Sequence, residues 1–359
     1  MKERIKKVQD LLKEKAFDVL YLENSMDLTY LTGLHLSAGR LIITPKTAYL
    51  LVDGRYFEKA KAHTQLQESL EVWLDTPEKL REILHYSKIV KFDGSTLPWE
   101  IVEKYIKEFP LLNFSSFPSP LKELRAEKED EEIAKMKQAA SLGAEGYDFL
   151  LSQLKEGVTE KELAQKLLIF WLNKGAQGVA FEPIIAFGAH SALPHHRASP
   201  TPLKKGDTVL LDTGVILDSY HSDMTRTVFF GQPSPQMKEI YEIVKAAHSK
   251  SASLLKASAK PSLLDVAARE VIAAQGYSDN YTHGLGHGIG LEIHEWPYLK
   301  NREPYLHDEL KASMFVTIEP GIYLPGLGGV RIEDTYLVLS DGAESITQRS
   351  HEIQVIPYV

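Results

Sequence analysis

The sequence predicts an α+β protein of two domains, a small α/β unit followed by a larger unit of helices and long strand pairs. The chain has 359 residues, more than a single domain usually holds. Its first third alternates helix-like and strand-like segments, which is typical of a sheet with covering helices. Residues 113–120 are rich in serine and proline, which favours a boundary there and gives domains at residues 1–120 and 121–359.

Apolar periodicity predicts the elements of the first domain. Ile5, Val8, Leu11 and Leu12 recur at helical spacing and predict an amphipathic helix over residues 2–15, unlike the continuous apolar core of a signal peptide. Apolar and β-branched runs predict strands that end at residue 23, flank Pro45 and cover 88–92, with helices from about residue 56 and over 98–109.

The second domain is expected to begin with one long charged helix over residues 121–154. Its acidic run EKEDEE lies near the start of that helix, where negative charge is favourable and solvated. Two strand pairs follow, 208–217 with 224–230 and 314–318 with 330–339. Since both pairs carry acidic residues, they hint at an internal duplication.

The composition limits the functions open to the chain. Forty-nine acidic against 41 basic residues leave a net charge of -8, which argues against nucleic acid as the main partner. The absence of cysteine excludes disulfides, thiolate metal sites and a cysteine nucleophile, and it fits a reducing cytoplasm. No apolar run approaches the roughly 20 residues of a membrane helix. We expect a cytoplasmic protein that does not enter membranes.

Four acidic residues stand at unusual places on the predicted strands. Asp212, Glu319 and Glu333 each follow an apolar stretch, and Asp223 directly precedes one. A buried carboxylate is unfavourable unless it is paired or bound to a metal. A turn aspartate or a charge on an edge strand explains one such acid, but it explains four matched acids much less well.

Histidines gather in two segments. His283, His287 and His294 lie among four glycines in YTHGLGHGIGLEIHEW. A single histidine there would more often be structural, but three beside four such acids favour metal ligation. Four carboxylates and one imidazole suit two divalent ions about 3.5–4 Å apart. The other segment, SALPHHRAS, carries the tandem pair His195 and His196 in a loop, where a surface pair is the simpler interpretation.

Several other catalytic motifs are missing. GLGHGIG lacks the G-x-G-x-x-G spacing of a dinucleotide loop, and the chain has no G-K-[ST] phosphate loop and no G-x-S-x-G elbow. His294 and Glu295 are followed by Trp-Pro, which would break the helix that an H-E-x-x-H zinc motif requires.

In this order, Asp212, Asp223, His287, Glu319 and Glu333 resemble the metal ligands of the pita-bread peptidases, which include methionine aminopeptidase, aminopeptidase P and prolidase. The two aspartates lie eleven positions apart and the two glutamates fourteen. The phrases HSDMTRT, HGLGHGIGLEIHE, EPGIY and VRIEDT are similar to the Xaa-Pro branch, and the resemblance extends from about residue 127 to the C-terminus. NSMDLTYLTG and DGRYFEKA resemble the N-terminal domain of prolidases, aminopeptidase P and creatinase.

The resemblance implies a pita-bread catalytic domain that holds two divalent metal ions. In it, Asp212 would chelate one ion, Asp223 and Glu333 would bridge both, and His287 and Glu319 would complete the shell of the second. Manganese is the first ion expected, with cobalt and zinc also open.

The resemblance also implies catalytic and supporting roles. Glu319 would accept and relay the proton of the attacking water. His195 would stabilise the oxyanion and His294 would orient the substrate. His283 and Arg331 would hold ligands in place. We assign the oxyanion role to His195 and not to its neighbour because it lies seventeen positions before Asp212, the spacing of the family.

The implied reaction is hydrolysis of the bond between an N-terminal residue and a penultimate proline. Aminopeptidase P and prolidase share these ligands and differ in the peptide length they admit. The interpretation leans to aminopeptidase P, with prolidase as the alternative and a non-catalytic peptide-binding protein as an alternative of a different class. Relatives with this N-terminal domain are often dimers, so we expect a homodimer.

Overall fold

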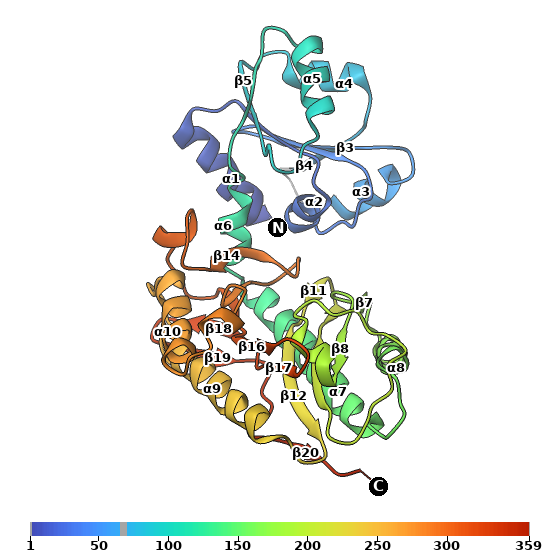
Figure 1. Cartoon of the computed structure of the whole chain (residues 1–359). Helices are drawn as coiled ribbons and strands as arrows, with labels where there is room; N and C mark the ends of the chain where they lie inside the picture. Colours follow the sequence, from blue (N-terminus) through green and yellow to red (C-terminus); the bar gives the residue numbers. More distant parts are fainter. Residues whose placement is uncertain (1, 65–69, 359) are drawn as a thin grey trace. The chain divides into compact units, whose positions relative to one another are not determined.

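The computed structural model describes residues 2–64 and 70–358. The chain divides into two compact units, Met1–Arg125 and Ala126–Val359 (Figure 1). Both units mix helices and strands, so the predicted α+β class is confirmed.

The described part of the first unit holds a six-stranded sheet with helices. The strand order is β4-β3-β2-β1-β5-β6. Strands β1, β2 and β3 pair antiparallel, and the other neighbours pair parallel. The elements in chain order are α1 (Lys2–Lys15), β1 (Val19–Leu22), α2 (Ser25–Thr32), β2 (Arg40–Ile43), β3 (Ala48–Val52), α3 (Phe57–Thr64), β4 (Leu70–Leu74), α4 (Pro77–Leu84), β5 (Ile89–Phe92), α5 (Trp99–Glu108), β6 (Asn113–Ser116) and α6 (Leu121–Ala126).

The predicted elements of this unit are confirmed, and the structure adds helices α2 and α4 and strand β4. Helix α2 is capped at its N-terminus by Asn24, whose side chain accepts hydrogen bonds from two backbone amides, and at its C-terminus by Gly33 with φ 72°. The serine- and proline-rich segment 113–120 is not irregular throughout, because 113–116 form edge strand β6. An edge strand pairs along one side only, so a weakly β-forming sequence can occupy it.

Helix α6 belongs to the first unit. The Tyr30 hydroxyl donates to the Leu124 carbonyl over 2.9 Å, and Arg125 lies 3.4 Å from the Asp27 carboxylate. Both contacts join α6 to α2. The division therefore comes after Arg125, whereas the serine- and proline-rich segment placed it after residue 120.

The second unit contains two main sheets, β20-β12-β9-β8 and β14-β13-β15-β18-β19. Its elements are α7 (Asp130–Gln153), α8 (Glu160–Asn173), β7 (Gly178–Val179), β8 (Ile184–Phe187), η1 (Gly188–Ala192), β9 (Thr208–Thr213), β10 (Val215–Leu217), β11 (Tyr220–His221), β12 (Met224–Phe230), α9 (Pro235–Ala252), α10 (Pro261–Ala274), η2 (Ser278–Asn280), β13 (Gly286–Gly288), β14 (Glu295–Leu299), η3 (Tyr305–His307), β15 (Phe315–Ile318), β16 (Gly321–Leu324), β17 (Gly328–Arg331), β18 (Asp334–Leu339), β19 (Gly342–Ser345) and β20 (Val355–Ile356).

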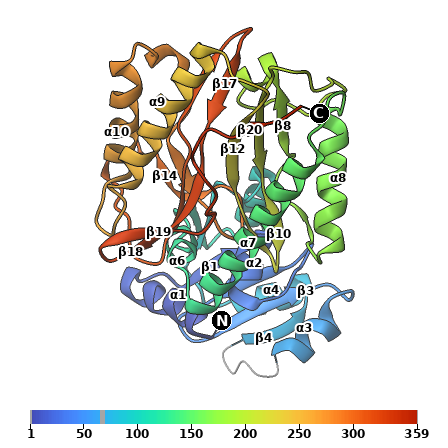
Figure 2. The same cartoon turned by 90° about the horizontal axis from the view of Figure 1, so that it is seen from below.

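Each main sheet packs against its own pair of helices. One apolar cluster joins α7 and α8 to β8, β9 and β12, and another joins α9 and α10 to β15 and β18. Figure 2 shows α9 and α10 at one side of the strands of this unit and α8 at the other. A bridge between Thr225 and Glu333 links the two sheets. This arrangement leaves the strand ends that carry the acidic residues in the middle of the unit.

Three expectations for the second unit are corrected. The long helix over 121–154 is interrupted after Ala126, because the Lys128 amide donates to the Ser313 carbonyl and the Glu129 amide donates to Glu132, which starts α7 anew. The expected strand 208–217 is broken at Gly214, where a Cβ atom would lie 2.2 Å from the Ser222 carbonyl oxygen. The expected strand 330–339 is likewise interrupted between β17 and β18.

Membrane insertion was not expected from the sequence. Across the described residues, no helix combines the length and the apolar character needed to span a bilayer.

Candidate metal centre

A single pocket of about 590 Å³ in the second unit brings the predicted site residues together. Its lining includes all nine of them: His195, Asp212, Asp223, His283, His287, His294, Glu319, Arg331 and Glu333.

The five predicted ligands come from both main sheets. Asp212 lies at the end of β9 and Asp223 directly before β12. His287 is the middle residue of β13, Glu319 follows β15, and Glu333 lies between β17 and β18. Strands β9 and β12 are buried along their whole length, so acids at their ends face the interior and not water. The bridge between the sheets therefore brings together residues that are more than 100 positions apart in the chain.

Ligand atoms lie close together in this pocket. His287 Nε2 is 3.6 Å from Asp223 Oδ2 and 3.6 Å from Glu319 Oε1. Ligand atoms of Asp223, His287 and Glu333 all lie within 4.8 Å of one another. The three side chains are buried, so water can do little to screen their charges.

Burial and the charges of the pocket's own residues oppose ionisation of the acids. Burial raises the pKa of Asp223 well above its usual value, and the charges of Glu333, Asp212 and Glu319 raise it further. Burial and the neighbouring acids likewise raise the pKa of Glu333 to about 8. Burial lowers the pKa of His287 to about 3, so its imidazole is neutral at pH 7. Neutral imidazole with crowded carboxylates is a donor set that a divalent cation would stabilise.

Two further observations fit a cation in this pocket. Asp212 Oδ1 is buried and has no hydrogen-bond partner among the described residues, while Oδ2 accepts from Arg331 over 2.5 Å. His287 Nδ1 lies 3.0 Å from the Gly288 carbonyl, which directs a proton to Nδ1 and leaves the Nε2 lone pair facing the acids. The residues present therefore fit divalent metal ions.

Arg331 connects the acids to a hydrogen-bonded group behind them. Its guanidinium donates to Asp212, to the Thr225 hydroxyl over 3.1 Å and to the Tyr323 hydroxyl over 2.8 Å. Tyr323 in turn lies 2.8 Å from His283 Nε2. Thr225 donates to Glu333 over 2.6 Å. Arg331 thus contacts Asp212 directly and Glu333 through Thr225, whereas His283 is linked to Arg331 through the Tyr323 hydroxyl.

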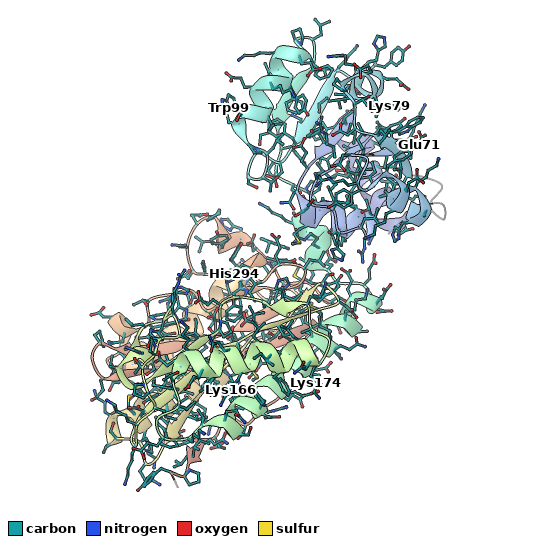
Figure 3. All side chains as sticks on the ribbon, turned by 90° about the vertical axis from the view of Figure 1, so that its right-hand side faces the viewer. Glu71, Lys79, Trp99, Lys166, Lys174 and His294 are labelled. Carbon is teal, nitrogen blue, oxygen red and sulfur yellow. The ribbon has the colours of Figure 1, made fainter. Side chains whose placement is uncertain are left out.

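The remaining histidines occupy different settings. His294, labelled in Figure 3, directly precedes β14, and its ring centroid lies 4.3 Å from that of His287. Burial and the charge of Lys300 lower the pKa of His294. His195 and His196 both line the pocket, but the His196 ring is tied to Glu160 over 2.8 Å.

Sequence reasoning missed four side chains that line this pocket or bind residues of its lining. Thr225 and Tyr323 lie inside the phrases HSDMTRT and EPGIY, so their positions beside predicted ligands were the available signal. Lys300 lies six positions after His294 and lines the pocket. Glu160 is the fourth, and nothing local distinguishes it from a solvent-exposed acid at a helix start.

The metal-free protein is expected to lose stability between pH 6.5 and 8. Glu333 has its pKa raised to about 8 in the folded chain, against 4.5 ordinarily, so it stabilises the fold fully below 4.5 and this contribution disappears as the pH rises through 8. Buried His283, with a pKa of about 3 against 6.5, acts in the opposite sense, but only below pH 6.5. Melting temperatures of chelated protein at pH 6.5, 7.25 and 8 measure the fall.

The Glu333→Gln variant is the control for that measurement. Because glutamine does not titrate, the chelated variant should show a flatter profile over this window than the wild type. A melting temperature of the chelated wild type that rises from pH 6.5 to 8 would contradict the assignment of a raised carboxyl pKa.

Comparison with known proteins places this geometry in a family. Residues 134–340 match "Metallopeptidase family M24", and residues 4–126 match "Creatinase/Prolidase N-terminal domain". The chain is 36% identical to the Xaa-Pro dipeptidase of Pyrococcus furiosus, over 98% of this chain and 100% of that protein.

Solved structures agree with the sequence comparison. The Xaa-Pro dipeptidase from Bacillus anthracis matches with a TM-score of 0.93 and 34% identity, covering 98% of this chain and 99% of that one. The X-Pro aminopeptidase from Thermotoga maritima matches with a TM-score of 0.86 and 32% identity, covering 95% and 98%. The predicted family and the pita-bread fold are confirmed. The chain therefore belongs to metallopeptidase family M24 and carries a creatinase/prolidase N-terminal domain.

Proposed function

We propose that this chain is an Xaa-Pro dipeptidase, a prolidase that hydrolyses dipeptides whose second residue is proline. The observation that carries the proposal is the identity of 36% over the whole length of a relative named Xaa-Pro dipeptidase, together with the buried four-carboxylate pocket. This favours the prolidase alternative over the aminopeptidase P to which the sequence analysis leaned. The X-Pro aminopeptidase of Thermotoga maritima, which is 32% identical, keeps aminopeptidase P as the second candidate.

The ligand set would be Asp212, Asp223, His287, Glu319 and Glu333, as the sequence analysis proposed. Divalent ions bound there supply a lowered pKa for water and polarisation of the scissile carbonyl. Manganese is the proposed ion, and a homodimer is the proposed assembly, which light scattering tests.

Glu319 is the proposed proton acceptor. It accepts one proton from the attacking water as the oxygen adds to the carbonyl carbon, and it delivers that proton to the proline nitrogen as the carbon–nitrogen bond breaks. Burial and the charges of neighbouring acids raise the pKa of its carboxyl, which is the direction that strengthens a base near neutral pH.

His195 and His294 are proposed to face the carbonyl oxygen and the substrate. Both line the pocket and both are exposed, so a bound peptide can reach their rings. N–H donors at these positions would stabilise the negative charge that develops on the oxygen. The apolar side chains of Phe181, Ile184 and Ile293 line the same pocket and offer a surface for the proline ring.

In an Xaa-Pro dipeptide, proline is the last residue and bears the free C-terminal carboxylate. Lys300 is proposed to bind this carboxylate. A Cβ atom on Gly284 would lie 2.6 Å from Lys300 Cγ, so this glycine makes room for the lysine stem in the pocket. The other two cations of the lining are paired, Arg331 with Asp212 and Arg197 with Glu182.

Lys300→Gln is therefore expected to lower kcat/KM for Ala-Pro by about 10–100-fold, the equivalent of one charge-assisted hydrogen bond. For Ala-Pro amide, which lacks the carboxylate, kcat/KM should fall less than threefold, because this substrate makes no carboxylate contact with Lys300 even in the wild type. The matched control is Arg302→Gln, an exposed cation outside the pocket. Equal losses on both substrates would contradict the carboxylate role.

The test of the proposed function is a release assay on chelated protein reconstituted with Mn²⁺, Co²⁺ or Zn²⁺. Ala-Pro and Ala-Pro-Ala are supplied in parallel. Cleavage of the dipeptide alone supports the prolidase, and cleavage of the tripeptide after its first residue makes the chain an aminopeptidase P. If neither peptide is cleaved with any of the three ions, the result would favour the non-catalytic peptide-binding alternative.

A further inference from the structure

The loop that carries His195 begins at the end of β8 and ends where the chain is hydrogen-bonded to the first turn of α8. It comprises residues 187–199 and includes η1 and the tandem histidines. Its far end is fixed to α8 through the backbone, since the Lys161 amide donates to the Ser199 carbonyl over 3.0 Å. The loop therefore leaves the sheet and returns to the first turn of one helix.

The Glu160 carboxylate binds this loop at both ends. Oε1 accepts hydrogen bonds from the Phe187 amide over 2.9 Å and from His190 Nδ1 over 2.9 Å. Oε2 accepts from His196 Nε2 over 2.8 Å and from Ser199, through its amide over 2.9 Å and its hydroxyl over 2.6 Å. Five donors from four loop residues thus converge on one side chain that is completely buried.

A carboxylate is the group that this position requires. Glu160 is the first residue of α8, where the helix dipole favours negative charge. Burial raises the pKa of Glu160, but the hydrogen bonds from Ser199, His196, Phe187 and His190 outweigh it and leave the pKa lowered. Five donors need an acceptor-only group, and an amide would place its own N–H atoms against at least one of them.

A second anchor fixes the loop from the two-stranded sheet of β16 and β17. The Ser191 hydroxyl accepts from the Gly329 amide over 2.8 Å and donates to the Gly188 carbonyl over 2.6 Å. Gly329 belongs to β17, the strand that leads to Arg331 and Glu333. Between the Ser191 anchor and the His196 anchor lie four residues, and the last of them is His195.

We propose that Glu160 is a positioning residue that holds His195 in the pocket, and that His196 is the clamp through which it acts. The proposal rests on the oxyanion role proposed for His195. It gives the tandem histidines different tasks, one facing the substrate and one bound to the scaffold. Glu160, His190 and His196 also offer ligand atoms within 4.8 Å of one another. However, the two imidazole nitrogens lie at hydrogen-bond distance from different oxygens of Glu160, and each of these oxygens also accepts a hydrogen bond from a backbone amide. These contacts favour a hydrogen-bonded cluster over a metal site.

The test is a double-mutant cycle of Glu160→Gln with His195→Ala, measured on Ala-Pro with the metal-loaded protein. His195→Ala should lower kcat by roughly 10²–10³-fold, the effect of losing one oxyanion donor. Glu160→Gln should lower kcat by roughly 10–100-fold with KM changed less than threefold, since a displaced group costs transition-state contacts first. In the double variant, Glu160→Gln should add less than threefold to the loss from His195→Ala.

Controls separate positioning from general damage. Glu162→Gln changes an exposed acid in the same first turn of α8 and should leave kcat within about threefold. If Glu160→Gln fails to fold, the cycle is run with His196→Ala, and His196→Gln, which keeps an N–H donor, should recover most of the lost kcat. Additive losses in the cycle, or a third bound metal ion that Glu160→Gln removes, would overturn the proposal.

Hydrogen exchange tests the clamp without any substrate. Peptides that contain the Phe187 and Ser199 amides should exchange roughly tenfold faster in Glu160→Gln than in the wild type, with the rest of the second unit unchanged. If the wild type cleaves no peptide, the proposed function fails, and the exchange data alone decide the clamp. Faster exchange confined to residues 187–199 supports it, and unchanged exchange overturns it.

Discussion

Replacement of Glu319 by glutamine is expected to lower kcat for Ala-Pro by roughly 10²–10⁴-fold, the usual contribution of a general base. Glutamine keeps the size of the side chain and an oxygen that faces His287 but cannot accept the proton of the attacking water. The measurement is the release of proline at saturating Ala-Pro, with the metal content of each preparation determined by mass spectrometry. The control is Glu309→Gln, the same chemical change at an exposed site.

The metal content decides what a loss of activity means. A loss of activity with two metal ions per chain retained supports the proton role of Glu319. If the ions are lost and excess Mn²⁺ restores activity, Glu319 acts mainly as a ligand. Activity near the wild-type value with full metal loading would contradict both roles.

Replacement of Arg226 by methionine is expected to lower the free energy of unfolding of the second unit by about 3–5 kcal/mol, the effect of breaking a buried ion pair. Arg226 and Asp334 are both 1% exposed, and Nη2 lies 2.6 Å from Oδ1. The same guanidinium donates to the carbonyls of Thr225 over 2.9 Å and Glu333 over 2.6 Å. Methionine keeps the apolar stem but leaves Asp334 without its main counter-charge.

Urea unfolding of this variant, followed by hydrogen exchange of peptides from β12 and β18, reports on the second unit alone. The control is Arg349→Met, which removes a more exposed pair with Asp148 at 2.6 Å and should cost at most about 1 kcal/mol. Equal losses for the two variants would mean that burial does not strengthen the Arg226 pair. His351 and His248 lie 2.5 and 3.4 Å from the other oxygen of Asp334, so this carboxylate keeps polar neighbours in the variant.

Local patterns predicted much of the fold because they need few distant contacts. The apolar spacing from Ile5 to Leu12 gives helix α1 over its full length, and the turn at Pro45 separates β2 from β3 as expected. Helices α2 and α4 were missed although their caps, Asn24 and Thr76, are visible in the sequence. Each is only eight residues long, too short for periodicity to stand out.

Breaks in long elements were not predictable from local pattern. The interruption between α6 and α7 depends on the Lys128 amide donating to Ser313, a residue far along the chain. The bend at Gly214 depends on the close approach of the Ser222 carbonyl. Helix and strand propensities contain no information about such partners.

The sequence by itself determined which acids and histidines would face one another. A carboxylate that follows a buried strand must find a partner in the interior, and the spacing of the five proposed ligands carried the resemblance that the family comparison confirmed. Sequence spacing already assigned the catalytic role to His195, but only the tertiary structure showed that its neighbour His196 is bound to Glu160. Glu160 starts a helix much as Glu162 does, and only the fold brings Phe187, His190, His196 and Ser199 to the first of the two. Hydrogen bonds between distant segments form only when folding brings those segments together. The local periodicity of the sequence therefore does not indicate which residues will be partners.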